Sequence, residues 1–131
     1  MQDLLIKKQI MNKNKWYNIV IWSICSICFL IFIIAASGKF SVSGNMYQNF
    51  LKWGYNYTVL IIVGLLEALG AIFLLVPKLR RIGAYILIFV MLAAIMTHII
   101  NFNEMGLPLF PIALVSLLTL ILFLNKYNQK Q

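Results

Sequence analysis

The chain has 131 residues, of which 63% are hydrophobic and 11% charged, and its net charge is +8. A soluble domain would be about half apolar and a quarter charged, so this composition excludes a mostly water-exposed surface. It also excludes a disordered chain and a nucleic-acid-binding domain, and two cysteines are too few for a disulfide-stapled scaffold. The whole chain, 1–131, is therefore predicted to form a single integral membrane domain.

Four apolar segments follow one another along the chain. They cover residues 17–38, 57–76, 82–100 and 107–124, and each has about 18–22 residues. A helix of this length, rising about 1.5 Å per residue, crosses a hydrocarbon core of about 30 Å. Backbone groups in lipid must be hydrogen-bonded internally, and the strands of a barrel would be shorter and would alternate in polarity. The predicted fold class is an all-α membrane protein, an antiparallel bundle of four transmembrane helices.

The loop between the first two spans carries a further helical pattern. Met46, Tyr47, Phe50 and Leu51 recur at helical spacing, with polar residues between them. We expect a short amphipathic helix that lies in the outer interface of the membrane. The alternative is an ordered loop without a helix.

Basic residues are divided unequally between the two sides of the predicted bundle. Two of them, Lys39 and Lys52, lie on the side that also carries Glu104. The other nine lie on the side of the termini: Lys7, Lys8, Lys13, Lys15, Lys78, Arg80, Arg81, Lys126 and Lys130. Because basic loops stay in the cytoplasm, this imbalance predicts a multi-pass protein with both termini cytoplasmic.

The first span also has features of a cleavable signal peptide. Lysines precede an apolar stretch, and Ala35-Ala36-Ser37-Gly38 resembles a cleavage site. The apolar stretch at 16–34 is longer than the roughly 7–15 residues of a signal peptide, which favours a retained transmembrane helix.

Glu67 lies about ten residues from either end of the second span, near the bilayer midplane. A carboxyl group there costs on the order of 2–3 kcal/mol, so it should face the bundle interior, where desolvation favours the neutral, hydrogen-bond-donating acid. Ser116 is the expected partner among residues at similar depth. The functional interpretation is a proton-carrying or ligand-binding carboxyl group. The alternative is a protonated acid with a purely structural role, whose hydrogen bond joins two helices.

Two further polar residues lie toward the outer side. Lys39 ends the first span, where its long side chain can extend to the interface, and His98 lies near the outer end of the third span. With Glu67 they could line a cavity that opens outward and bind a ligand or protons. Alternatively, the three are separate interfacial or packing residues. One histidine without clustered carboxylates gives no basis for a metal site.

Cys25 and Cys28 form a C-x-x-C pair within the first span. This spacing is typical of thioredoxin-like redox sites, but a position inside a helix near a reducing cytoplasm favours buried thiols that pack as small apolar groups. Small residues on the second and third spans are expected to let helices approach closely. They include Gly64, Ala68, Gly70, Ala71, Gly83, Ala84, Ala93 and Ala94.

Three short motifs carry a resemblance to a known family. They are G-x-x-E-x-x-G-A at 64–71, L-L-x-P at 74–77, and an arginine before Gly83-Ala84. Together they resemble the DoxX-like family of small bacterial membrane proteins, over roughly residues 30–124. The sequence pattern of this family also matches at Gly38-Lys39-Phe40 and at residues 94–98.

The resemblance implies a four-helix protein of the bacterial cytoplasmic membrane, and it singles out Lys39, Glu67 and His98. The family is named after a subunit associated with a thiosulfate:quinone oxidoreductase. No cofactor is evident from the residues, so a quinone is implied only by this resemblance. The leading hypothesis is an accessory or ligand-binding subunit, without independent catalytic activity, for quinone-linked electron or sulfur metabolism. Its partners would be the lipid bilayer, another membrane or redox subunit, or further copies of itself.

Two other hypotheses stay open. One is a structural partner of another membrane complex, and the other is a small proton-coupled transporter that uses Glu67. Four-helix exporters carry such a glutamate in their first helix and have nearly balanced basic loops, whereas here the acid is in the second span. Glu67→Gln is expected to abolish ligand binding and to spare the fold.

Overall fold

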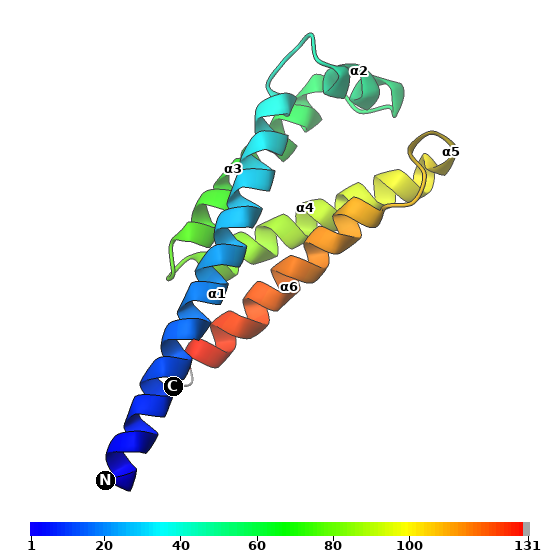
Figure 1. Cartoon of the computed structure of the whole chain (residues 1–131). Coiled ribbons are helices and arrows are strands. Elements are labelled where there is room, and N and C mark those ends of the chain that lie inside the picture. Colours follow the sequence, from blue (N-terminus) through cyan, green and yellow to red (C-terminus); the bar gives the residue numbers. More distant parts are fainter. Residues whose placement is uncertain (130–131) are drawn as a thin grey trace.

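The computed structural model describes residues 1–129 and is helical through most of that range (Figure 1). Its helices are α1 (Gln2–Lys39), α2 (Asn45–Lys52), α3 (Tyr57–Leu75), α4 (Arg80–Ile100), α5 (Phe102–Met105) and α6 (Leu109–Gln129). Four of them, α1, α3, α4 and α6, are long and apolar enough to cross a membrane. No strand occurs within 1–129, so the predicted all-α membrane fold is confirmed.

The starts of α3, α4 and α6 lie within two residues of the predicted starts. Helix α3 begins where the Asn56 side chain accepts a hydrogen bond from the Val59 amide (3.0 Å), and it ends before Val76, whose extended backbone suits the following proline. Helix α1 differs, because it begins at Gln2 instead of near residue 17. The lysine-bearing arm contains no glycine or proline, so nothing interrupts the helix before Gly38.

The four long helices run alternately up and down, and successive ones pack side by side: α1 with α3, α3 with α4, and α4 with α6. Helix α1 starts and α6 ends at one end of the molecule, which we call the inner end. The short helices α2 and α5 lie at the opposite, outer end. In Figure 1, α4 and α6 diverge from α1 and α3 toward the outer end.

Two glycines allow α3 and α4 to pack closely in the inner half. A Cβ atom on Gly83 would lie 2.6 Å from the Gly70 carbonyl oxygen, and one on Gly70 would lie 2.7 Å from the side chain of Leu87. A side chain at Gly83 would meet backbone atoms and force the two helices apart, whereas one at Gly70 would require the Leu87 side chain to move. The predicted role in helix packing is confirmed for Gly70 and Gly83, whereas Ala93 and Ala94 line a cavity in the outer half.

Polar contacts join the helices at the inner end. The Tyr17 hydroxyl of α1 donates to the Leu124 carbonyl of α6. Arg80, which lies outside the predicted third span at 82–100, is instead the buried first residue of α4. Its Nε donates to the Leu74 carbonyl (2.9 Å), and its guanidinium lies 4.9 Å from the centre of the Trp22 ring. The arginine thus caps the last turn of α3.

The outer end carries the predicted short helix and one that the sequence analysis missed. Helix α2 spans the expected residues, from the residue after Gly44 to just before a turn at Gly54 with φ of +82°. Helix α5 has a single turn and ends at Gly106, whose φ is +69°. Such a short helix has too few residues to show a hydrophobic period, so the pattern could not reveal it.

Large apolar side chains cover the outside of the long helices. Examples with about half or more of their surface exposed are Leu30, Ile34, Leu65, Phe89 and Phe123. An apolar exterior around internally hydrogen-bonded helices is the arrangement that contact with lipid requires.

Candidate functional site

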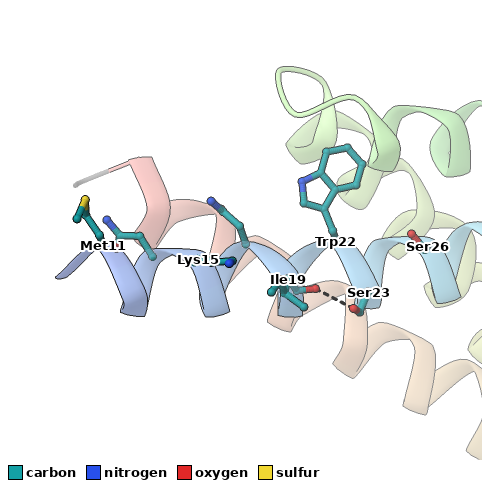
Figure 2. Close-up of a pocket in the computed structure, with 8 residues that line it drawn as sticks. Met11, Lys15, Ile19, Trp22, Ser23 and Ser26 are labelled. Carbon is teal, nitrogen blue, oxygen red and sulfur yellow. Dashed lines mark hydrogen bonds between the residues drawn. The ribbon is translucent and has the colours of Figure 1, made fainter. Parts of the chain in front are cut away.

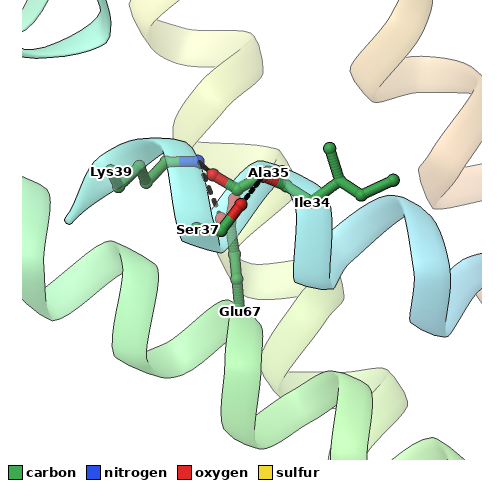
Figure 3. Close-up of polar contacts among 5 residues, drawn as sticks. All are labelled: Ile34, Ala35, Ser37, Lys39 and Glu67. Atoms are coloured by element: carbon green, nitrogen blue, oxygen red, sulfur yellow. Dashed lines mark hydrogen bonds and ion pairs between the residues drawn. The ribbon is translucent and has the colours of Figure 1, made fainter. Parts of the chain in front are cut away.

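The main polar feature of the outer half is an ion pair between Lys39 and Glu67 (Figure 3). Lys39 Nζ lies 2.7 Å from Glu67 Oε2 and 3.3 Å from the carbonyl oxygen of Ala35. Only 6% of the lysine and 2% of the glutamate are exposed. A buried charge is tolerated when an opposite charge and hydrogen bonds replace its water, and each residue provides this for the other.

The backbone explains how the end of α1 comes so close to α3. Gly64 lies about one turn before Glu67, and a Cβ atom there would lie 3.3 Å from both the Lys39 Cβ and the Phe40 ring. With no side chain at this position, the last turn of α1 rests against α3. The lysine ammonium then reaches the carboxyl group from the neighbouring helix.

Two expectations about these residues were wrong. Lys39 does not extend to the outer interface but folds back into the bundle (Figure 3). Glu67 accepts a hydrogen bond from Lys39 instead of donating one to Ser116, whose hydroxyl faces outward and donates to the Ile112 carbonyl (3.0 Å). Depth along the helices could not determine which way Ser116 faces.

A cavity of about 550 Å³ lies beside the ion pair. Its walls come from all four long helices, with Lys39, Glu67 and His98 among the lining residues. Most of the other lining side chains are apolar, including Phe32, Val63 and Met91. This size and lining are typical of sites for small organic ligands. The three residues singled out by the sequence therefore share one cavity, and their role in binding stays a prediction.

His98 contributes the third polar group of this cavity. Its Nδ1 atom is buried and has no hydrogen-bond partner among residues 1–129. Within the same range, no hydrogen bond joins it to Glu67, which agrees with its shallower position along α4. The ring therefore has an unused hydrogen-bonding position.

The short helices and the connection between α2 and α3 lie over the outer side of this cavity. Phe50 and Trp53 line it from above, and the Tyr55 hydroxyl lies 3.0 Å from Thr97 Oγ1. Because Thr97 Oγ1 donates to the Ala93 carbonyl (3.0 Å), Tyr55 is the donor to the threonine. No sequence pattern indicated this contact, because residues 55 and 97 are far apart along the chain.

An ion pair links the two short helices directly. Lys52 Nζ of α2 lies 3.4 Å from Glu104 Oε2 of α5, and both side chains are at least half exposed. We call α2, α5 and Tyr55 together the outer cover. Two contacts, Tyr55 with Thr97 and Lys52 with Glu104, hold this cover across the space between the α1–α3 pair and the α4–α6 pair.

A second hollow lies along α1 near the inner end (Figure 2). All its lining residues belong to this one helix, including Lys15, Trp22 and Ser26. The Ser23 hydroxyl donates to the Ile19 carbonyl (2.8 Å) within the helix. With no second element to enclose a ligand, this is an open helix surface and not a binding cavity.

Cys25 and Cys28 are both free and fully buried in the core. Neither lines the cavity. Their burial agrees with the prediction that these thiols pack as small apolar groups. Among residues 1–129, no three His, Cys, Asp or Glu side chains gather where they could hold a metal ion.

Together, these features define a multi-pass helical membrane protein with a covered cavity in its outer half. The chain belongs to the DoxX-like family, whose sequence profile matches residues 23–121, from within α1 to near the end of α6. The matched region contains Lys39, Glu67 and His98. Comparison with curated proteins and with solved structures gave no match.

Proposed function

We propose that this protein is a ligand-binding accessory subunit of the cytoplasmic membrane, and that its outer cavity holds a lipid-soluble ligand. The observation that carries this proposal is the cavity itself, an apolar space of about 550 Å³ with a buried ion pair in its wall. A bundle that only fills space would be close-packed. Quinones are the ligand class implied by the family resemblance, and they provide the first probes.

The inner end is proposed to face the cytoplasm. Of the nine basic residues assigned to this side, Lys130 lies outside the described residues, and Arg80 is buried. The other seven are exposed, as the positive-inside rule requires of topology-determining charges. Reporter fusions at both termini should report a cytoplasmic location, and an insertion between α1 and α2 should report the opposite side. Termini on the outer side would contradict this part of the proposal.

The direct experiment is to purify the protein in mild detergent and identify what accompanies it. Mass spectrometry of an organic extract, together with a visible spectrum, should find a bound small molecule in near-stoichiometric amount. A co-purifying protein with no small molecule would favour the structural-partner hypothesis instead. Proton-coupled uptake in vesicles that is lost in a Glu67 variant would favour transport.

Binding can be measured through Trp53, which lines the cavity. In a Trp16→Phe/Trp22→Phe background, Trp53 is the remaining tryptophan, so quenching by a short-chain quinone reports occupancy. The double variant Lys39→Gln/Glu67→Gln removes the ion pair that joins α1 to α3 in the cavity wall, and the altered wall should weaken binding by roughly tenfold. Ser116→Ala, at similar depth but facing outward, is the matched control. Equal affinity in all three proteins would contradict the proposal.

A further inference from the structure

His98 is the residue whose environment in the cavity is incomplete. Its Nδ1 is buried without a partner within 1–129, whereas buried polar atoms in proteins are nearly always hydrogen-bonded. Arg80 Nη2 and Asn125 Nδ2 share this condition, but neither residue lines the cavity. Of these three residues, His98 is the one that lines the cavity, and because its Nδ1 is covered by protein atoms a ligand would meet the rest of the imidazole ring.

Three other polar residues of the wall already have partners inside the protein. Lys39 and Glu67 bond to each other, and Thr97 is engaged by Tyr55 and by the Ala93 carbonyl. A ligand that approaches these groups competes with existing contacts. The His98 ring lines the cavity and has no hydrogen bond within residues 1–129, so a ligand that bonds to this ring breaks no existing contact.

The charges of the wall indicate which kind of head group is favoured. The ammonium of Lys39 and the carboxylate of Glu67 lie 2.7 Å apart and cancel each other. A charged ligand would lose its hydration on entering and would find no unpaired counter-charge. A neutral hydroxyl or carbonyl group has a much smaller desolvation cost, which one hydrogen bond can offset.

From these observations we infer that the cavity binds an uncharged amphipathic molecule whose hydroxyl or carbonyl head is hydrogen-bonded to the imidazole ring of His98. Its apolar body lies against the aliphatic and aromatic side chains of the wall, among them Phe32, Val63 and Met91. This inference rests on the proposed function, because it assigns the ligand class and the recognition residue of the same cavity. A membrane lipid such as a diacylglycerol and a free long-chain alcohol share this chemistry.

The test uses four brominated twelve-carbon probes, an alkane, an alcohol, a carboxylate and an amine, each of which quenches Trp53 when bound. The protein is the full chain in lipid nanodiscs, in the background where Trp53 is the remaining tryptophan. The alcohol should bind at least tenfold more tightly than the carboxylate or the amine. Adding dioleoylglycerol as a competitor distinguishes a bilayer lipid from a free alcohol as the source of the head group.

His98 variants then separate recognition from packing. His98→Ala should raise the Kd of the alcohol by roughly 5–10-fold and leave that of the alkane nearly unchanged, and His98→Gln should restore part of the difference. Equal loss for alcohol and alkane, or no loss for either, would overturn the role of His98. Tightest binding of a charged probe would overturn the ligand class. Quenching by none of the probes would contradict the proposed function itself.

Discussion

The long helices pack closely against each other in the inner half of the bundle, whereas a cavity lies between them in the outer half. In the inner half, Gly70 and Gly83 let α3 and α4 touch through their backbones, and the two cysteines fill the remaining space. In the outer half, no residue of α4 beyond Met91 is fully buried, and a cavity separates the helices. Close contact in the inner half needs only small residues, whereas the cavity of the outer half is bordered by an ion pair between α1 and α3 and by a cover over its outer side.

The largest expected effect comes from removing one charge of the outer half. Glu67→Gln leaves the buried Lys39 ammonium unpaired, so the free energy of unfolding should fall by about 3–5 kcal/mol. This replaces the expectation that the variant spares the fold. The double variant Lys39→Gln/Glu67→Gln should lose less than half as much. Unfolding by dodecyl sulfate in mixed micelles measures both, and a double variant less stable than the single would refute the pairing.

The second prediction concerns the close contact of the inner half. Gly83→Ala places a methyl group 2.6 Å from the Gly70 carbonyl oxygen, so α3 and α4 must separate, at a cost of about 1–3 kcal/mol. Gly38→Ala is the control, because no atom lies within 4 Å of the added Cβ. The same unfolding assay should find a loss in the first variant only. Equal stability of both would show that the inner half is less tightly packed than described.

A smaller effect is expected at the outer cover. Tyr55→Phe removes the hydrogen bond to Thr97, which typically contributes about 0.5–1.5 kcal/mol. Hydrogen exchange should accelerate in α2 and remain unchanged in the inner half of α3. Tyr85→Phe, an exposed tyrosine of α4, serves as control. Unchanged exchange in α2 would mean that this bond does not hold the cover.

The smallest effect should come from the exposed pair of the same cover. Lys52→Ala breaks the 3.4 Å contact with Glu104 and should cost less than about 1 kcal/mol. Because salt screens exposed charges, the difference from the unmodified protein should vanish near 1 M salt. Exchange rates in α5 at low and high salt provide the measurement. A difference that persists at high salt would indicate a role other than charge.

The sequence predicted the architecture well, because a long apolar segment in lipid must hydrogen-bond its own backbone and therefore forms a helix. Length and polarity alone located the spans, and the period of Met46, Tyr47, Phe50 and Leu51 located α2. The site was predicted only in part. Glu67, Lys39 and His98 were recognised as costly polar residues, but which way a side chain points around a helix depends on contacts between distant segments. The Lys39–Glu67 pair follows from the close approach at Gly64, which no local pattern reveals.

The length of α1 has a mechanical consequence. Its 38 residues extend about 57 Å, nearly twice the thickness of the hydrocarbon layer, so a long rod projects from the inner end. Since no glycine or proline interrupts it before Gly38, the projecting part and the span form one continuous helix. Any tilt of the membrane span therefore displaces Lys7 and Lys8 by a large distance, because they lie near the far end of the helix. The same helix ends at Lys39, so the ion pair and the projecting lysines lie at opposite ends of α1.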